Sequence, residues 1–415
     1  MSCSQYPVDI AIIGGGIAGL WTLARIRQLG YQAILLEADK LGCEQSCASQ
    51  GIIHGGTKYA LTGKLTHSSQ SIQQMPERWK KCLQGVGEVD LSNSKKLSDF
   101  QYLWSNKSLA ARLTGFFASK VMSSRMSHLS NKDFMPPFDS ANFNGELYQL
   151  DEPVLDSQSV IENLRVQFQK FIIQFKVDNL SFIENTDTKN SASKNSDMLI
   201  SNNNNLLLIS AKNIILTAGS ANEKLLALLQ LNHRKMQRRP LLMPMLKAKK
   251  SILPQIYAHC LGSSALPKMT ITSHLLDNEI VWYLGGDIAE KGIHRTIIEQ
   301  VKCAKEELQS LMPWMDFSSC QWSALAIDRA EPQMPDASRP SDPAVYRDNN
   351  IISAWPVKLA MVPLMVDKII AELAQIAQPA TGENTPEPLL MDLTDRLEMA
   401  QTTLLPWEKI DKWIK

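Results

Sequence analysis

The sequence predicts an α/β fold in which a discontinuous, mainly parallel sheet is combined with a separate antiparallel sheet. Three observations support this prediction. Near the N-terminus a short apolar strand is followed at once by a glycine-rich turn and a helix. Another apolar strand, residues 212–219, lies far downstream in the sequence. Several strand-like runs with turn residues between them fill residues 240–290.

The first forty residues have the pattern of a nucleotide-binding βαβ unit. Residues 8–13 are apolar and β-branched, as in a strand that is buried on both faces of a parallel sheet. The run GGGIAG at 14–19 fits G-x-G-x-x-G, and a predicted helix at 20–29 leads to a second strand at 33–36. Gly14 would permit the tight turn, Gly16 the approach of a pyrophosphate, and Gly19 close packing of helix on strand.

The same unit offers groups for the rest of a dinucleotide. The N-terminus of the helix presents N–H groups and partial positive charge to phosphates. Glu37 ends the second strand, where an acidic side chain accepts hydrogen bonds from a ribose diol. The downstream strand that ends in Thr217, Ala218 and Gly219 favours FAD over NAD, because a fold that closes over a flavin nucleotide is built from several segments.

Two further segments carry a family resemblance. Residues 46–59, SCASQGIIHGGTKY, resemble the flavin-facing segment of the D-amino-acid oxidase superfamily, and most of all its FAD-dependent glycerol-3-phosphate dehydrogenases and L-2-hydroxyglutarate dehydrogenases. Residues 355–359, WPVKL, are similar to the segment that caps the flavin pyrimidine in the first of these branches, with Pro356 and Val357 in place of two glycines. Arg329 stands where the family carries a substrate-binding arginine.

The resemblance implies a Rossmann-like FAD-binding domain that is discontinuous in sequence. We expect it to comprise residues 1–75, 150–235 and 320–378, with an antiparallel β-sheet substrate domain at 76–149 and 236–319. Residues 379–415 are expected to form a C-terminal appendage at the surface. Residues 184–205 are polar and low in complexity and predict an exposed hairpin and loop.

Motif and resemblance together give a set of residues expected to bind FAD. They are Gly14, Gly16, Ile17, Ala18, Gly19, Glu37, Ala38, Ser46, Ser49, Gln50, Gly51, Ile53, Val177, Ala218, Gly219, Lys358 and Leu359.

Two residues are predicted to act beside the flavin ring. His54 is suited to take a hydroxyl proton near neutral pH, with covalent attachment to the flavin or a structural role as alternatives. Lys358 would stabilise the negative charge of reduced flavin or contact the substrate.

Three residues are predicted to hold an acidic substrate. Lys58 and Tyr59 would contact its phosphate or carboxylate, unless they form a surface pair. Arg329 would clamp the same kind of group in a bidentate manner. The alternative for Arg329 is an ion pair with Asp328 or Glu331.

These residues predict an FAD-dependent dehydrogenase or oxidase that moves a hydride from the C–OH of a hydroxy acid or a glycerol-3-phosphate-like compound to flavin. The alternatives are an amino-acid or secondary-amine oxidase, a flavoprotein that acts on or docks to a macromolecule or membrane, and a family member that binds FAD structurally. The electron acceptor, oxygen or a quinone, stays open. No nucleophile-elbow motif supports a hydrolase.

The composition of the chain bears on its expected partners and localisation. A net charge of +1 gives no reason to expect nucleic acid as a partner. Seven scattered cysteines, no signal peptide and no long apolar run favour a cytoplasmic enzyme. Cys43 and Cys47 are expected to be reduced thiols, with a redox pair or metal ligands as the alternative, and no metal is predicted. The basic segment 233–250 is either a solvated face or a contact with anionic lipid or nucleic acid, so the enzyme could also be membrane-peripheral.

Overall fold

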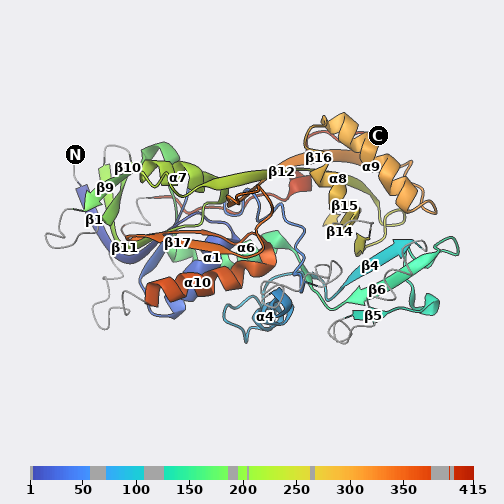
Figure 1. The fold of residues 1–415 in the computed structure, drawn as a ribbon, viewed down its shortest axis with the longest axis horizontal. Coiled ribbons are helices and arrows are strands. Elements are labelled where there is room, and N and C mark those ends of the chain that lie inside the picture. The colour runs from blue at the N-terminus through green and yellow to red at the C-terminus, as the bar shows by residue number, and fades with distance from the viewer. Residues whose placement is uncertain are drawn as a thin grey trace.

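Two eight-stranded sheets form the framework of the protein, and Figure 1 shows them toward opposite ends of an elongated molecule. The computed structural model describes residues 3–56, 72–106, 126–185, 195–202, 205–261, 267–374, 392 and 397–415. The long strands β12 (Met236–Lys249) and β16 (Gln321–Pro332) extend from the second sheet toward the first.

The first sheet is mainly parallel and carries the glycine-rich turn. Its strand β1 pairs in parallel with both β11 and β2. Residues 10–12 of β1 are fully buried, which explains the unbroken apolar run in the sequence. In spatial order the strands are β17 (Ala344–Asp348), β18 (Ile351–Trp355), β11 (Asn205–Leu216), β1 (Cys3–Ile13), β2 (Ala33–Glu37) and β8 (Ile172–Gln174), with β10 (Asn195–Asn202) on β11 and β9 (Leu180–Asn185) on β10.

Helices α1, α6 and α10 share one hydrophobic core with the first sheet. Among the described residues, no helix has the length and apolar character needed to cross a membrane. The α-helices are α1 (Ile17–Gln28), α4 (Met75–Leu83), α6 (Ser157–Phe168), α7 (Asn222–Leu228), α8 (Asp287–Glu290), α9 (Ile297–Leu311) and α10 (Val362–Ala374). Short 3₁₀ turns span Asn131–Asp133, Gln169–Phe171, Val177–Asn179, Gly219–Ala221, Leu359–Met361 and Pro406–Lys409.

The second sheet is antiparallel apart from one parallel pair, β13 with β4. Its core holds three fully buried tryptophans, Trp104, Trp282 and Trp322, and helix α9 packs into the same core. In spatial order its strands are β16, β12, β15 (Glu279–Gly285), β14 (Met269–Leu276), β13 (Tyr257–Cys260), β4 (Gln101–Asn106), β6 (Gly145–Leu150) and β5 (Met126–His128). A separate pair joins β3 (Lys96–Ser98) to β7 (Val154–Leu155).

The structure confirms the α/β fold class and differs from the expected organisation at two strands. Strand β16 pairs with β12 along its whole length and so belongs to the second sheet, although the expected boundaries place 320–378 in the FAD-binding domain. Strand β10 lies within the segment 184–205 that was expected to be exposed. It pairs with β9 and β11 and buries Met198 and Ile200, because an apolar side chain follows at every second position.

The described C-terminal residues 400–414 are not a surface appendage, whereas residues 379–391 and 393–396 of the predicted appendage lie outside the described residues. We use the name C-terminal strap for residues 400–414. At its start Thr402 bridges to Leu41, next to the first sheet, and at its end Ile414 bridges to Trp322 of the second sheet. Trp407, midway along the strap, is only 2% exposed. The polar composition of 379–415 predicted a surface position, but buried apolar contacts hold the strap against both parts of the molecule.

Candidate functional site

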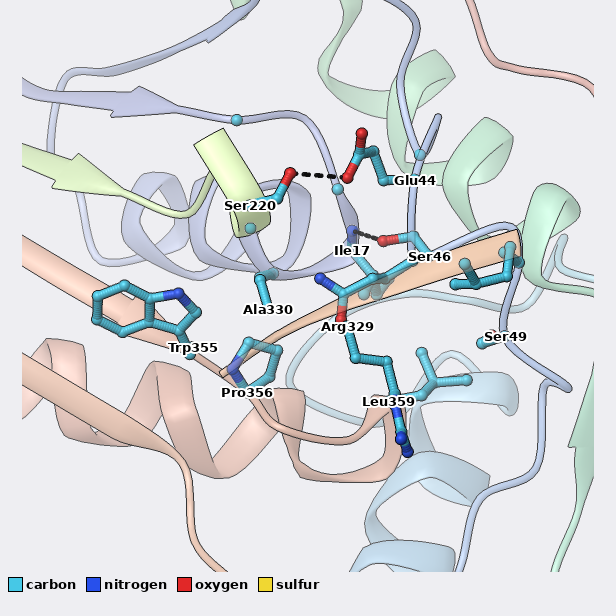
Figure 2. Close-up of a pocket in the computed structure, with 18 of the residues that line it drawn as sticks. Ile17, Glu44, Ser46, Ser49, Ser220, Arg329, Ala330, Trp355, Pro356 and Leu359 are labelled. Atoms are coloured by element: carbon cyan, nitrogen blue, oxygen red, sulfur yellow. Dashed lines mark hydrogen bonds between the residues drawn. The ribbon is translucent and has the colours of Figure 1, made fainter. Parts of the chain in front are cut away.

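A cavity of about 490 Å³ lies between the two sheets and collects most of the predicted site residues. Figure 2 shows Ile17 and Ser46 of the first half of the chain around the same space as Arg329, Pro356 and Leu359. The predicted residues that line the cavity are Gly14, Gly16, Ile17, Ala18, Glu37, Ala38, Ser46, Ser49, Gln50, Gly51, His54, Ala218, Gly219, Arg329, Lys358 and Leu359.

Five predicted residues are not in this wall. Gly19 is the third residue of α1, where it serves packing, and Ile53 is fully buried in the hydrophobic core. The side chain of Val177 and the whole of Lys58 and Tyr59 lie outside the described residues. The predicted roles of these last three therefore stay predictions.

The glycine-rich turn adopts the geometry that the motif predicts. Gly14 has a φ of +110°, and a Cβ there would lie 2.5 Å from the Cα of Ala218. A Cβ on Gly19 would lie 1.9 Å from the carbonyl oxygen of Gly14. Both positions therefore require glycine, since any side chain would separate β1, α1 and the end of β11. The first turn of α1 then lines the cavity, so the positive end of the helix dipole can stabilise phosphate groups there.

Glu37, at the end of β2, orders the turn next to it. Its Oε2 accepts a hydrogen bond from the backbone N–H of Gly15 at 2.5 Å. Its Oε1 accepts from the N–H groups of Ala38 at 2.7 Å and Asp39 at 2.9 Å. Burial raises the pKa of this carboxyl, and the three N–H donors oppose that rise. A carboxylate offers about four lone-pair sites, so it can still accept from a ribose diol.

The segment after Glu37 connects the two sheets across the cavity. The hydroxyl of Ser46 accepts a hydrogen bond from the backbone N–H of Ile17 at 3.0 Å, at the start of α1. The side-chain amide of Gln50 donates to the carbonyls of Thr270 at 3.1 Å and Tyr283 at 3.0 Å, on strands β14 and β15. The predicted flavin-facing segment is thus fixed from both sides.

The turn at Pro356 and Val357 contains a positive φ, a conformation that favours glycine. Val357 has a φ of +64°, a conformation that β-branched residues rarely adopt. The N–H of Lys358 donates to the carbonyl of Pro356 at 2.7 Å, which closes a three-residue turn. Lys358 and Leu359 line the cavity as a result. Strained backbone of this kind is concentrated at functional sites.

His54 lies in a buried polar cluster that the sequence only partly revealed. Its Nδ1 is 3.6 Å from a carboxylate oxygen of Glu152, a side chain that is 3% exposed. The N–H of Gly55 donates to Glu152 at 2.7 Å, and the amide of Gln101 donates to its other oxygen. The ring of His259 stacks on that of His54, with centroids 5.4 Å apart.

His259 also lines the cavity, and sequence reasoning missed it. Its Nδ1 lies 2.7 Å from the hydroxyl of Thr270 on the neighbouring strand. A histidine inside an otherwise apolar strand, Tyr257–Cys260, was the available signal. Glu152 gave none, because it precedes a proline in a segment without periodicity.

Arg329 lies in the cavity wall and forms an ion pair with Glu290. The sequence did not suggest this partner. Its two terminal nitrogens donate to Glu290 at 3.2 Å each, and its Nε donates to the carbonyl of Arg239 at 3.0 Å. Of the two partners considered from the sequence, Asp328 pairs with Arg238 and Glu331 with Arg239. Burial lowers the pKa of the Arg329 guanidinium, and the charge of Arg239 lowers it further.

The basic segment 233–250 is largely neutralised. Arg234 pairs with Asp348, Arg238 with Glu223 and Asp328, Arg239 with Glu290 and Glu331, and Lys247 with Glu279. All three arginines of the segment are therefore in ion pairs.

The cysteines near the cavity do not form a metal site. Burial raises the pKa of Cys43 and of Cys47 to about 12, so both thiols are protonated near neutral pH. Within the described ranges, no group of three or more potential metal ligands comes together.

Comparison with known proteins identifies the family. A family model described as FAD dependent oxidoreductase, DAO, matches residues 9–269. The chain belongs to this family. A probable FAD-dependent oxidoreductase of Pseudomonas aeruginosa, PA4991, is 41% identical over 369 residues, which cover 88% of this chain and 91% of that protein. Its crystal structure matches with a TM-score of 0.78 at 34% identity over 98% of both chains.

More distant solved structures share the fold. Glycine oxidase from Geobacillus kaustophilus matches with a TM-score of 0.60 at 13% identity, over 92% of this chain and 98% of its own. L-α-glycerophosphate oxidase from Mycoplasma pneumoniae, solved with FAD bound, matches with a TM-score of 0.60 at 12% identity, over 96% of this chain and 97% of its own.

The geometry fits the cofactor of the DAO family. The tight turn at Gly14 to Gly16, the start of α1 and the Glu37 carboxylate line the cavity and suit the pyrophosphate and the ribose of FAD. The protein is therefore an FAD-dependent oxidoreductase, and FAD is its cofactor. The segments 46–51 and 356–359 line the same cavity beyond the turn, where the resemblance places the flavin ring.

Proposed function

We propose that the protein oxidises the C–OH group of a small anionic substrate, either a hydroxy acid or a glycerol-3-phosphate-like alcohol. One observation carries the proposal. A single cavity joins the dinucleotide-binding turn to a histidine beside a buried carboxylate and to two arginines, Arg329 and Arg339. A site of this kind can hold the cofactor, remove a hydroxyl proton and neutralise an acidic group.

The charge around Arg329 favours an anion. Three guanidiniums, those of Arg239, Arg329 and Arg339, are electrostatically coupled there, and two carboxylates, Glu290 and Glu331, face them. The group therefore carries one excess positive charge in a place that is largely screened from water. An anionic substrate would compensate this charge, whereas a cationic one would be repelled.

His54 is suited to accept the hydroxyl proton. Its Nδ1 faces Glu152, so the carboxylate would stabilise the ring once it becomes positively charged. Glu152 is itself held in place by the N–H of Gly55 and the amide of Gln101. The arrangement orients the base and lowers the cost of charging it, as in other histidine–carboxylate pairs.

FAD, when bound, accepts the hydride that leaves the substrate carbon. Lys358 lines the cavity and would supply positive charge beside the reduced cofactor. Pro356 and Val357 stand in place of the two glycines of the related enzymes. Lys358 still lines the cavity after them, in a turn in which Val357 has a positive φ.

The test is an anaerobic reduction assay on the FAD-loaded protein. Glycerol-3-phosphate, lactate, 2-hydroxyglutarate, glycine and proline are mixed in turn with the protein, and bleaching of the visible flavin band is followed. We expect bleaching by one or more of the hydroxy compounds. Bleaching by the amines alone would assign the protein to amine oxidation, and no bleaching by any compound would remove the proposed substrate class.

Variants at the histidine–carboxylate pair test the proton step. We expect His54→Asn to lower the rate of flavin reduction by about 100-fold, the usual contribution of a positioned base. Glu152→Gln should move the acidic limb of the pH profile to lower pH, because the ring would lose the carboxylate that favours its protonation. An unchanged profile in Glu152→Gln would separate Glu152 from the step.

A further inference from the structure

Arg329 and Arg339 line the cavity and differ in how they are paired. Arg329 donates to Glu290 and to a backbone carbonyl, as described above. Arg239 contacts Glu290 and Glu331 at 3.3 Å each, and Glu331 is 1% exposed. These four side chains form a closed network between β12, β16 and α8. Their charges cancel, since two guanidiniums face two carboxylates.

Arg339 is the exception. It lines the cavity from the loop between β16 and β17. Its Nε is buried, and among the residues that the structure describes its guanidinium makes neither a hydrogen bond nor an ion pair. Its charge acts on Arg329, where it contributes to the lowered pKa. It therefore lies close to the network without sharing the network's carboxylates.

The loop that carries Arg339 is held in place. The side-chain amide of Gln237 donates to the carbonyl of Ser338 at 2.8 Å, and the N–H of Met334 donates to the same side chain at 3.1 Å. The two carboxylates nearest in sequence each accept from a serine: Asp336 from the N–H of Ser338 at 3.1 Å and Asp342 from the hydroxyl of Ser341 at 2.9 Å. The backbone thus presents Arg339 to the cavity from an anchored position on β12.

We propose that Arg339 is the residue that binds the anionic group of the substrate, whereas Arg329 and Arg239 hold the cavity wall together through Glu290 and Glu331. This inference rests on the proposed function, because it names the anchor for the anion that the function requires. A partly buried guanidinium without a counter-ion is unfavourable, and an incoming phosphate or carboxylate would supply one. Its planar fork suits either group in a bidentate contact.

The experiment uses anions that bind without turnover. FAD-loaded wild type, Arg339→Gln and the matched control Arg238→Gln are titrated with inorganic phosphate and with oxalate, and the flavin difference spectrum gives the Kd. Arg238 is half exposed and lies outside the cavity wall. We expect at least one of the anions to bind wild type and the control alike. Its Kd should rise by about 10- to 100-fold in Arg339→Gln, as for the loss of a charged hydrogen-bonded pair.

The affinity for FAD is measured on the same proteins, because a cofactor phosphate is the other anion that Arg339 could meet. An unchanged FAD affinity together with weakened anion binding supports the inference. Weakened FAD affinity with unchanged anion binding overturns it and makes Arg339 a cofactor ligand. Equal anion binding in all three proteins, or no anion binding in wild type, also overturns it.

A variant that keeps the positive charge distinguishes loss of anion binding from loss of the fold. Arg339→Lys keeps the cation and should bind the anion with an affinity between those of wild type and Arg339→Gln. If Arg339→Lys binds as weakly as Arg339→Gln while both keep FAD, a point charge does not suffice and the bidentate contact is supported. These titrations need no substrate oxidation. Their result therefore tests the role of Arg339 independently of the anaerobic reduction assay, which tests the proposed function.

Discussion

The two sheets contribute to the cavity in different ways. The first sheet supplies mainly backbone: the turn at Gly14, the first N–H groups of α1 and the end of β11. The second sheet supplies side chains, with Arg329 from β16 and His259 from β13. A backbone site can be recognised in a short contiguous motif, because its geometry follows from a few glycines. A side-chain site depends on strands that lie far apart in the sequence.

The two sheets should also differ in which property of the protein a substitution changes. Substitutions in the first sheet should change cofactor binding, whereas substitutions in the second should change substrate binding and pH dependence. The C-terminal strap contacts both, so damage to it should affect the two together. Variants of Trp407, Gly14, His274 and Val357 test this division.

The largest expected effect is on stability, from Trp407→Ala in the strap. Trp407 is buried, and its ring stacks on His274 with centroids 3.9 Å apart. Removing a buried tryptophan leaves a cavity, so we expect a loss of about 3–5 kcal/mol in the free energy of unfolding. Urea unfolding measures it. Trp413→Ala, at a partly exposed position on the same strap, is the control. Equal losses in the two variants would contradict a central role for Trp407.

Gly14→Ala should remove most of the affinity for FAD. A methyl group there would collide with the backbone of Ala218, and the positive φ disfavours any side chain. We expect FAD to bind about 100-fold more weakly or not at all, a change of about 2.7 kcal/mol. Gly85→Ala is the matched control, since Gly85 also has a positive φ but meets nothing closer than 3.4 Å. Fluorescence titration of the apoprotein distinguishes the two.

His274 should make the protein sensitive to acid. Burial lowers its pKa from 6.5 to about 3, so the folded protein keeps this ring neutral. As the pH falls from 6.5 toward 3, the unfolded chain binds a proton that the folded protein does not. Stability is therefore lost through this window, with a slope of about 1.4 kcal/mol per pH unit from this group.

The variant His274→Gln removes this titration and should flatten the decline by the same slope. Unfolding by urea at several pH values between about 7 and about 5 measures it. His128→Gln, at an exposed position, is measured alongside as the control for replacing a histidine outside the core. A slope that is the same in His274→Gln and wild type would assign the acid sensitivity to other groups.

The smallest expected effect is an increase in stability. Val357→Gly should relieve the strained positive φ in the turn before Lys358 and stabilise the protein by about 1 kcal/mol. The gain is limited because glycine loses more backbone entropy on folding. Thermal unfolding of the FAD-loaded protein is the measurement. A lower melting temperature would show that packing of the valine outweighs the strain.

Most of the residues around the glycine-rich end of the cavity could be predicted from the sequence. The turn at Gly14, the acid at Glu37 and the start of α1 form one contiguous unit, so spacing alone fixes how they lie. The segment around His54 and the lysine at 358 followed from a family resemblance, and both line the cavity. Strands β13, β14 and β15 of the second sheet were also predicted, because apolar runs separated by turn residues mark them.

The tertiary structure alone decided which side chains meet. The sequence offered Asp328 and Glu331 as partners for Arg329, yet its partner is Glu290, because pairing of β16 with β12 and the position of α8 bring that carboxylate to it. Arg339 showed nothing in the sequence that distinguishes it from other surface arginines. The strap looked like a polar tail, and only its contacts with both sheets bury Trp407. Local spacing determines backbone geometry, whereas ion pairs and burial depend on contacts between distant segments.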